Sequence, residues 1–132
     1  MTSIPHKALV VIADGRKAIL FRNTGDGKTV ELHEEKRLTP KDLIDSGPSG
    51  SRPEEQSPNQ TDEATFAKQL ADKLYKMKHA NEFEAMVLAA DPQTLGQMRE
   101  TMHKTVADSI VVSHSKDWTN HSTNDIAAAL NK

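Results

Sequence analysis

The feature that most constrains the fold is a run of six apolar residues, Ala8 to Ala13, followed at once by Asp14-Gly15. A short apolar run rich in valine and isoleucine is typical of a strand that is covered on both faces and lies in the middle of its sheet. Asp-Gly is a dipeptide that closes tight hairpins. The chain is therefore expected to begin with a central strand that turns back into an antiparallel neighbour.

Two more strands are predicted after this hairpin, at residues 17–23 and 29–35, with a glycine-containing turn between them. In the later strand Val30 and Leu32 alternate with polar residues, a pattern typical of a strand with one solvated face. The first third of the chain is therefore predicted to be a three-stranded antiparallel meander.

The rest of the chain alternates helical and strand patterns. A helix is predicted from a cap at Thr61 to about residue 80, because its large apolar residues share one stripe: Phe66, Leu70, Leu74 and Met77. A second apolar strand, Met86 to Ala90, precedes Asp91-Pro92, an N-cap with proline at the first helical position. A short strand at residues 110–112 and a last helix capped by Ser122 complete the pattern.

The predicted element order is β-β-β-α-β-α-β-α, which calls for a mixed five-stranded sheet with helices on its faces. Right-handed crossovers place the fourth and fifth strands parallel to the first and beyond it, in the spatial order 3-2-1-4-5. This is the arrangement of ribonuclease H-like domains. At 132 residues the whole chain, 1–132, is expected to form a single α/β domain.

Residues 39–60 differ in composition from the rest of the chain. They hold four of the six prolines and four serines, with only Leu43 and Ile44 as large apolar residues. Such a stretch buries too little surface to offset its ordering entropy, which predicts a flexible loop. A loop this long is either disordered without a function or a binding element, and the sequence leaves both interpretations open.

Composition excludes several classes of site. The chain has no cysteine, so disulfides, thiolate nucleophiles and cysteine zinc sites are excluded. The net charge of -2 argues against strong electrostatic binding of nucleic acid or anionic lipid over the whole surface of the chain. A local basic patch is compatible with this charge. No signal peptide or membrane-spanning stretch is recognised, so a cytoplasmic location and no membrane partner are expected. No cofactor motif is recognised, and the six histidines are scattered, so no metal site is predicted.

Several segments, in collinear order over nearly the whole chain, resemble the bacterial host attachment protein family. The segments that carry the resemblance are Val11–Ala18, Phe66–Ala71, Glu82–Ala90, Pro92–Arg99 and Ser115–Thr119. The resemblance implies a role in attachment to host cells, and the lack of a signal peptide makes an indirect role the expectation.

That family is in turn similar to the middle domain of the class I release factors of archaea and eukaryotes. This similarity implies a ribonuclease H-like topology and a Gly-Gly-Gln tripeptide between the third strand and the first helix. Here that place is taken by residues 39–60, where Gly47, Gly50 and Gln56 are separated. Peptidyl-tRNA hydrolysis is therefore not expected, and a role with RNA or the ribosome is an analogy from fold.

Asp14 and Asp91 are the catalytic candidates. They close two strands that are predicted to be neighbours and parallel, so both lie at one edge of the sheet, where a two-metal nuclease needs its carboxylates. Each also has a simpler explanation, because Asp14 belongs to a hairpin turn and Asp91 to a helix cap. The sequence therefore favours a protein without catalytic activity.

The binding candidates are basic, amide and aromatic side chains near the first hairpin, in the long loop and before the last helix. They are Arg16, Lys17, Arg37, Arg52, Gln56, Lys116 and Trp118. Acidic residues lie among them, so a solvated surface is the competing interpretation. Trp118 either stacks on a base or anchors the last helix against the sheet, and the second interpretation is preferred.

Three hypotheses follow. The favoured one is a non-enzymatic binding module whose partner is RNA or the ribosome. The second is a metal-dependent, ribonuclease H-like hydrolase that uses Asp14 and Asp91. The third is a domain that binds another protein and influences surface attachment indirectly. The sequence leaves the oligomeric state open.

Overall fold

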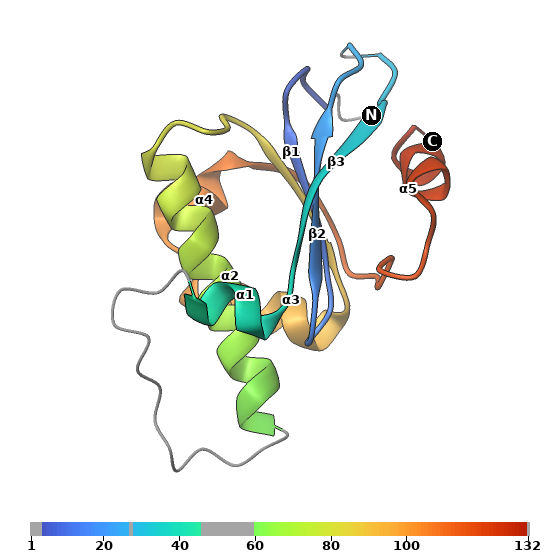
Figure 1. Cartoon of the computed structure of the whole chain (residues 1–132). Helices are drawn as coiled ribbons and strands as arrows, with labels where there is room; N and C mark the ends of the chain where they lie inside the picture. Colours follow the sequence, from blue (N-terminus) through green and yellow to red (C-terminus); the bar gives the residue numbers. More distant parts are fainter. Residues whose placement is uncertain (1–3, 27, 46–59, 132) are drawn as a thin grey trace.

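Five strands form one mixed sheet in the order β3-β2-β1-β4-β5 (Figure 1). A computed structural model describes residues 4–26, 28–45 and 60–131 of the chain. The strands are β1 (Leu9–Ala13), β2 (Ala18–Asn23), β3 (Leu32–Leu38), β4 (Met86–Ala90) and β5 (Ile110–His114). β1 pairs antiparallel with β2 and parallel with β4. The predicted α/β class, mixed sheet and strand order are confirmed.

The sheet separates two cores. Along β1, Leu9 and Val11 contribute to one buried cluster, while Val10 and Ile12 contribute to the other, because successive side chains of a strand point to opposite faces. Every residue of β1 and β4 is buried, as the two apolar runs predict for central strands.

Helices cover both faces of the sheet unequally (Figure 1). The first core cluster contains side chains of α1 (Pro40–Asp45), α2 (Gln60–His79), α3 (Pro92–Thr101) and α4 (Lys104–Ser109). The second core cluster is closed by α5 (Thr123–Leu130) and the segment before it. Over the residues that the structure describes, none of the helices is long and apolar enough to cross a membrane.

Helix α2 buries the predicted stripe of Phe66, Leu70, Leu74 and Met77. It begins at Gln60, so Thr61 lies within the helix and is not its cap. The predicted caps of the other two helices are confirmed: Asp91 accepts a hydrogen bond from the Thr94 amide, and Ser122 accepts one from the Asp125 amide.

The predicted third strand is wrong by three residues, because β3 spans Leu32–Leu38 and not residues 29–35. The side chain of Asn23 explains the longer turn. Its Oδ1 atom accepts hydrogen bonds from the amides of Gly25 and Glu31, at 3.0 and 3.1 Å, beside the backbone bond from the Thr24 amide to the Glu31 carbonyl oxygen at 2.8 Å. β3 is an edge strand in which only Leu38 is buried.

The prediction of a flexible loop over residues 39–60 is also wrong in part, because residues 40–45 form helix α1. The Asp42 carboxylate accepts hydrogen bonds from the backbone amide and the hydroxyl of Thr39, and Leu43 is buried in the first core cluster. Residues 46–59 lie outside the described residues. The short helix α4 was not predicted, and β5 runs two residues further than predicted, to His114.

Candidate functional site

The tip of the β1–β2 hairpin presents basic side chains on a turn that Asp14 organises. The Asp14 Oδ1 atom accepts hydrogen bonds from the amides of Arg16 and Lys17, at 2.7 and 2.8 Å. The Asp14 amide in turn donates to the Lys17 carbonyl oxygen at 3.0 Å. These three bonds fix the turn, and they leave the Arg16 side chain exposed and that of Lys17 half-buried.

The segment between β5 and α5 lies against this turn. The Lys17 Nζ atom donates to the Asn120 Oδ1 atom at 3.4 Å, across 103 positions of sequence. The Thr119 hydroxyl lies 3.2 Å from Asp14 Oδ2 and 2.6 Å from Asp117 Oδ1, so its single proton serves the shorter contact. The exposed Lys116 belongs to the same segment. We call the surface of Asp14, Arg16, Lys17, Asp91 and Lys116 the hairpin edge.

A polar cavity of about 270 Å³ opens at the hairpin edge, lined by Asp14, Gly15, Arg16, Asp91, Gln93, Thr94 and Gln97. Ala13 pairs with Ala90 across the parallel strands, so the following residues, Asp14 and Asp91, leave the sheet side by side. The carboxyl ends of parallel strands are where open α/β sheets usually bind their ligands.

Two acceptor atoms of this cavity's residues have no partner in the part of the chain that the structure describes. Asp91 uses its Oδ2 atom to cap α3, at 3.1 Å from the Thr94 amide nitrogen. Its Oδ1 atom and the Gln97 Oε1 atom are buried, and neither has a hydrogen-bond partner among the described residues. A buried acceptor without a partner costs free energy, so the cavity favours a ligand that brings N–H or O–H donors.

Asp14 and Asp91 are the only predicted catalytic candidates, and the structure does place them at one sheet edge. Each already accepts hydrogen bonds from nearby backbone amides. Within the part of the chain that the structure describes, no three histidine or acidic side chains gather in a group that could hold a metal ion. Among the described residues, the geometry therefore adds no third ligand to the pair.

The other predicted binding residues are dispersed. Arg37 lies on the edge strand β3, opposite Ile19, and forms an ion pair with Glu34 at 2.9 Å. Arg52 and Gln56 lie outside the described residues. Of the seven predicted binding residues, Arg16, Lys17 and Lys116 share the hairpin edge.

Trp118 belongs to the second core cluster and is only 8% exposed. Its ring contacts the His114 ring, with the two centroids 4.9 Å apart. This burial favours the anchoring interpretation, and it leaves too little of the ring exposed to stack on a base. Burial, followed by the charge of Lys116, lowers the pKa of His114 below its usual value of 6.5.

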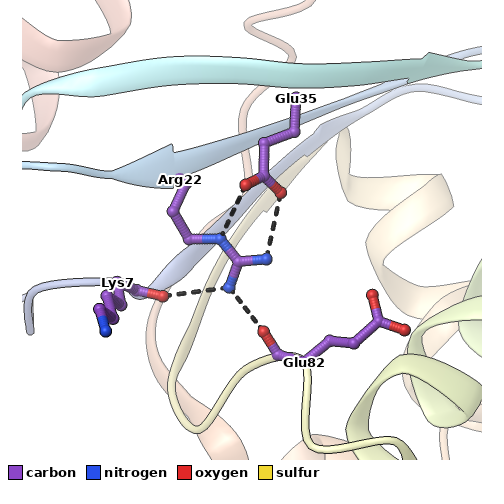
Figure 2. Close-up of polar contacts among 4 residues, drawn as sticks. All are labelled: Lys7, Arg22, Glu35 and Glu82. Atoms are coloured by element: carbon purple, nitrogen blue, oxygen red, sulfur yellow. Dashed lines mark hydrogen bonds and ion pairs between the residues drawn. The ribbon is translucent and has the colours of Figure 1, made fainter.

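Arg22 is a structurally important residue that is not among the predicted site residues. Its guanidinium joins three parts of the chain at the other end of the sheet (Figure 2). It binds both carboxylate oxygens of Glu35, at 3.1 and 3.2 Å, and donates to the carbonyl oxygens of Lys7 and Glu82, at 3.1 and 2.8 Å. A cavity of about 670 Å³ lies here, and Lys7 and Asn81 in its walls have φ angles of 73° and 61°. No sequence pattern marks Arg22, because its carbonyl partners are distant backbone atoms.

The sheet order, the helices on both faces and the polar site at the strand ends define an α/β domain of ribonuclease H-like topology. A family model described as bacterial archaeo-eukaryotic release factor family 12 matches residues 7–130. The chain belongs to this family. No curated protein matches the chain. The family match confirms the release-factor part of the resemblance, whereas a role in host attachment stays a prediction.

Proposed function

We propose that this chain is a non-enzymatic binding module that contacts RNA through the hairpin edge, with the ribosome as its partner. One observation carries the proposal. Arg16 lines a polar cavity, and its turn contacts the segment that follows Lys116, through Lys17–Asn120 and Asp14–Thr119, in a chain that belongs to a release-factor family.

The chemistry of the hairpin edge suits a nucleic-acid backbone. Arginine and lysine side chains bind phosphate oxygens, and these contacts supply affinity without reading sequence. The partnerless acceptors of Asp91 and Gln97 suit the amino and imino donors of a base edge. A protein that binds in this way needs no catalytic group.

Co-sedimentation with ribosomes at graded salt concentrations tests the proposal. The double variant Arg16→Gln/Lys116→Gln removes two positive charges from the hairpin edge. We expect it to weaken binding and to reduce the slope of log affinity against log salt by about 2, one for each lost phosphate contact.

The matched control is Lys7→Gln/Lys28→Gln, which removes the same charge at the opposite end of the sheet. We expect this control to sediment with ribosomes as the natural chain does. Equal losses of ribosome binding in both double variants would show that binding depends only on the net charge of the chain. That result would contradict a specific contact through the hairpin edge. Binding that does not depend on salt would contradict the proposal outright.

A metal-dependent hydrolase is the alternative that the shared cavity of Asp14 and Asp91 supports. Magnesium-dependent cleavage of RNA that is abolished by Asp14→Asn would favour it. Asp14→Asn retains an acceptor for the amides of the turn, so the hairpin is expected to persist. If the natural chain has no turnover, this alternative is wrong and the binding proposal is unaffected.

We also propose that any influence on attachment to host cells follows indirectly from this binding. A protein partner is the competing route to such an effect. A complex that survives nuclease treatment and includes another protein would favour that route. A complex that nuclease dissolves would favour RNA.

A further inference from the structure

Three aromatic rings lie together on the helical layer, away from the hairpin edge. Tyr75 of α2 is half-buried, and its ring centroid lies 4.4 Å from that of His103 and 6.1 Å from that of His79. The planes of Tyr75 and His103 are inclined by 32°. His103 is exposed, at the junction between α3 and α4. Tyr75 and His103 therefore form a tilted aromatic pair, of which His103 lies at the protein's exterior.

A cavity of about 480 Å³ adjoins the two rings. It is lined by Lys68, Gln69, Ala71, Asp72, Tyr75, Thr101 and His103. Lys68 is exposed and brings a positive charge to the cavity. Gln69 brings an amide that can both donate and accept hydrogen bonds.

His103 is held in place by its role as a helix cap. Its Nδ1 atom accepts a hydrogen bond from the Thr105 amide at 3.2 Å and so caps α4. An imidazole ring fixed beside a phenol ring suits stacking with another planar aromatic system.

We infer that this cavity binds a nucleobase, stacked against the aromatic pair of Tyr75 and His103, with Lys68 near its phosphate. The ligand class is a nucleotide of single-stranded RNA, since bases in a duplex are already stacked. The inference extends the proposed RNA contact to a second surface, but it does not depend on the hairpin edge.

Titration with adenosine 5′-monophosphate, followed by NMR, tests this site. Tyr75 is the only tyrosine, so its ring signals are unambiguous. We expect these signals to shift with a Kd of about 1 mM or tighter. Ribose 5-phosphate carries the phosphate without the base, and we expect it to leave the ring signals unchanged. Equal shifts with both compounds, or none with the nucleotide, would overturn the inference.

His103→Asn is the discriminating variant. Asparagine is a good N-cap residue, so it preserves the α4 cap and removes only the ring. We expect it to weaken nucleotide binding about fivefold or more. His121→Asn, which removes an exposed histidine before α5, is the control and should bind as the natural chain does. Unchanged affinity in His103→Asn would overturn the inference.

Two further variants keep the result interpretable. Tyr75→Leu retains the apolar contact with the core, and calorimetry should show the same loss of nucleotide binding. The Arg16→Gln/Lys116→Gln variant should still bind the mononucleotide, because the hairpin edge is not involved. Loss of nucleotide binding in that variant would assign the binding to the hairpin edge and contradict a second site.

Discussion

Arg22 holds the strained backbone of Lys7: its Nη1 atom donates to the Lys7 carbonyl oxygen at 3.1 Å, and Lys7 has a φ angle of 73°. A lysine in this left-handed region costs free energy that the surrounding contacts must offset. Arg22 supplies several of those contacts, because the same guanidinium also binds Glu35 and the Glu82 carbonyl oxygen (Figure 2).

Replacing Arg22 is therefore expected to destabilise the fold. Its side chain is 17% exposed, whereas that of Arg37, in the comparable ion pair with Glu34, is 63% exposed. We predict that Arg22→Met lowers the free energy of unfolding by about 1–3 kcal/mol, because it leaves two carbonyl groups and a carboxylate unpaired. Arg37→Met should change it by less than about 0.5 kcal/mol. Urea denaturation measures both, and similar losses would show that Arg22 has no special role.

Gly25 and Gly96 should respond oppositely to alanine. A Cβ atom at Gly25 would overlap the Thr29 carbonyl oxygen and lie 3.0 Å from the Glu31 amide nitrogen, whereas at Gly96 it would meet nothing within 4 Å. We predict that Gly25→Ala lowers the free energy of unfolding by about 1–3 kcal/mol. Gly96→Ala, inside helix α3, should raise it by about 0.5–1 kcal/mol. Denaturation curves with changes of the same sign would contradict this pair of predictions.

Stability should fall at mildly acidic pH because of His114. Burial first, and then Lys116, lower the pKa of this imidazole in the folded chain. The unfolded chain therefore binds more protons than the folded chain as the pH falls below the unfolded pKa of about 6.5. The stabilising effect of the neutral ring is complete above that value and decreases as the pH falls toward the folded pKa.

The variant His114→Gln tests this linkage. We predict a smaller loss of stability between about pH 7 and pH 5 than in the natural chain. His121→Gln removes an exposed histidine and should leave the pH dependence unchanged. Thermal denaturation at both pH values measures the effect, and a steeper loss in His114→Gln would contradict the sign of the linkage.

Trp118 should affect stability and leave RNA binding unchanged. It is buried in the second core cluster against the sheet. We predict that Trp118→Phe lowers the free energy of unfolding by about 1–2 kcal/mol, because it leaves unfilled space in that core. Co-sedimentation with ribosomes should be unaffected at temperatures where the variant is folded. Selective loss of sedimentation would restore the base-stacking interpretation.

The sequence predicted those strands, turns and caps that depend on residues close together along the chain. The apolar runs that became β1 and β4 are buried at every residue, and Asp14, Asp91 and Ser122 make the turn or cap contacts that their positions predict. These side chains bind backbone amides no more than three positions away, so the short pattern already contains both partners.

The third strand shows where local pattern failed. Val30 is buried, but not as part of a strand: its amide and carbonyl groups are bonded by the side chain of Asn131, at 2.6 and 3.0 Å. The alternation of Val30 with polar residues therefore reflected contact with the end of α5, 101 positions away, and not strand pairing. The helix α1 was missed because the packing of Leu43 outweighed the loop-like composition around it.

The sequence by itself determined the central strands, the caps at Asp91 and Ser122, the sheet order and the residue types available for binding. Only the tertiary structure decided that Lys17 meets Asn120, that Tyr75 meets His103, and that Arg22 joins backbone segments 15 and 60 positions away. The physical reason is the range of the interactions. Burial and capping depend on neighbours along the chain, whereas a site depends on which distant segments the sheet brings together.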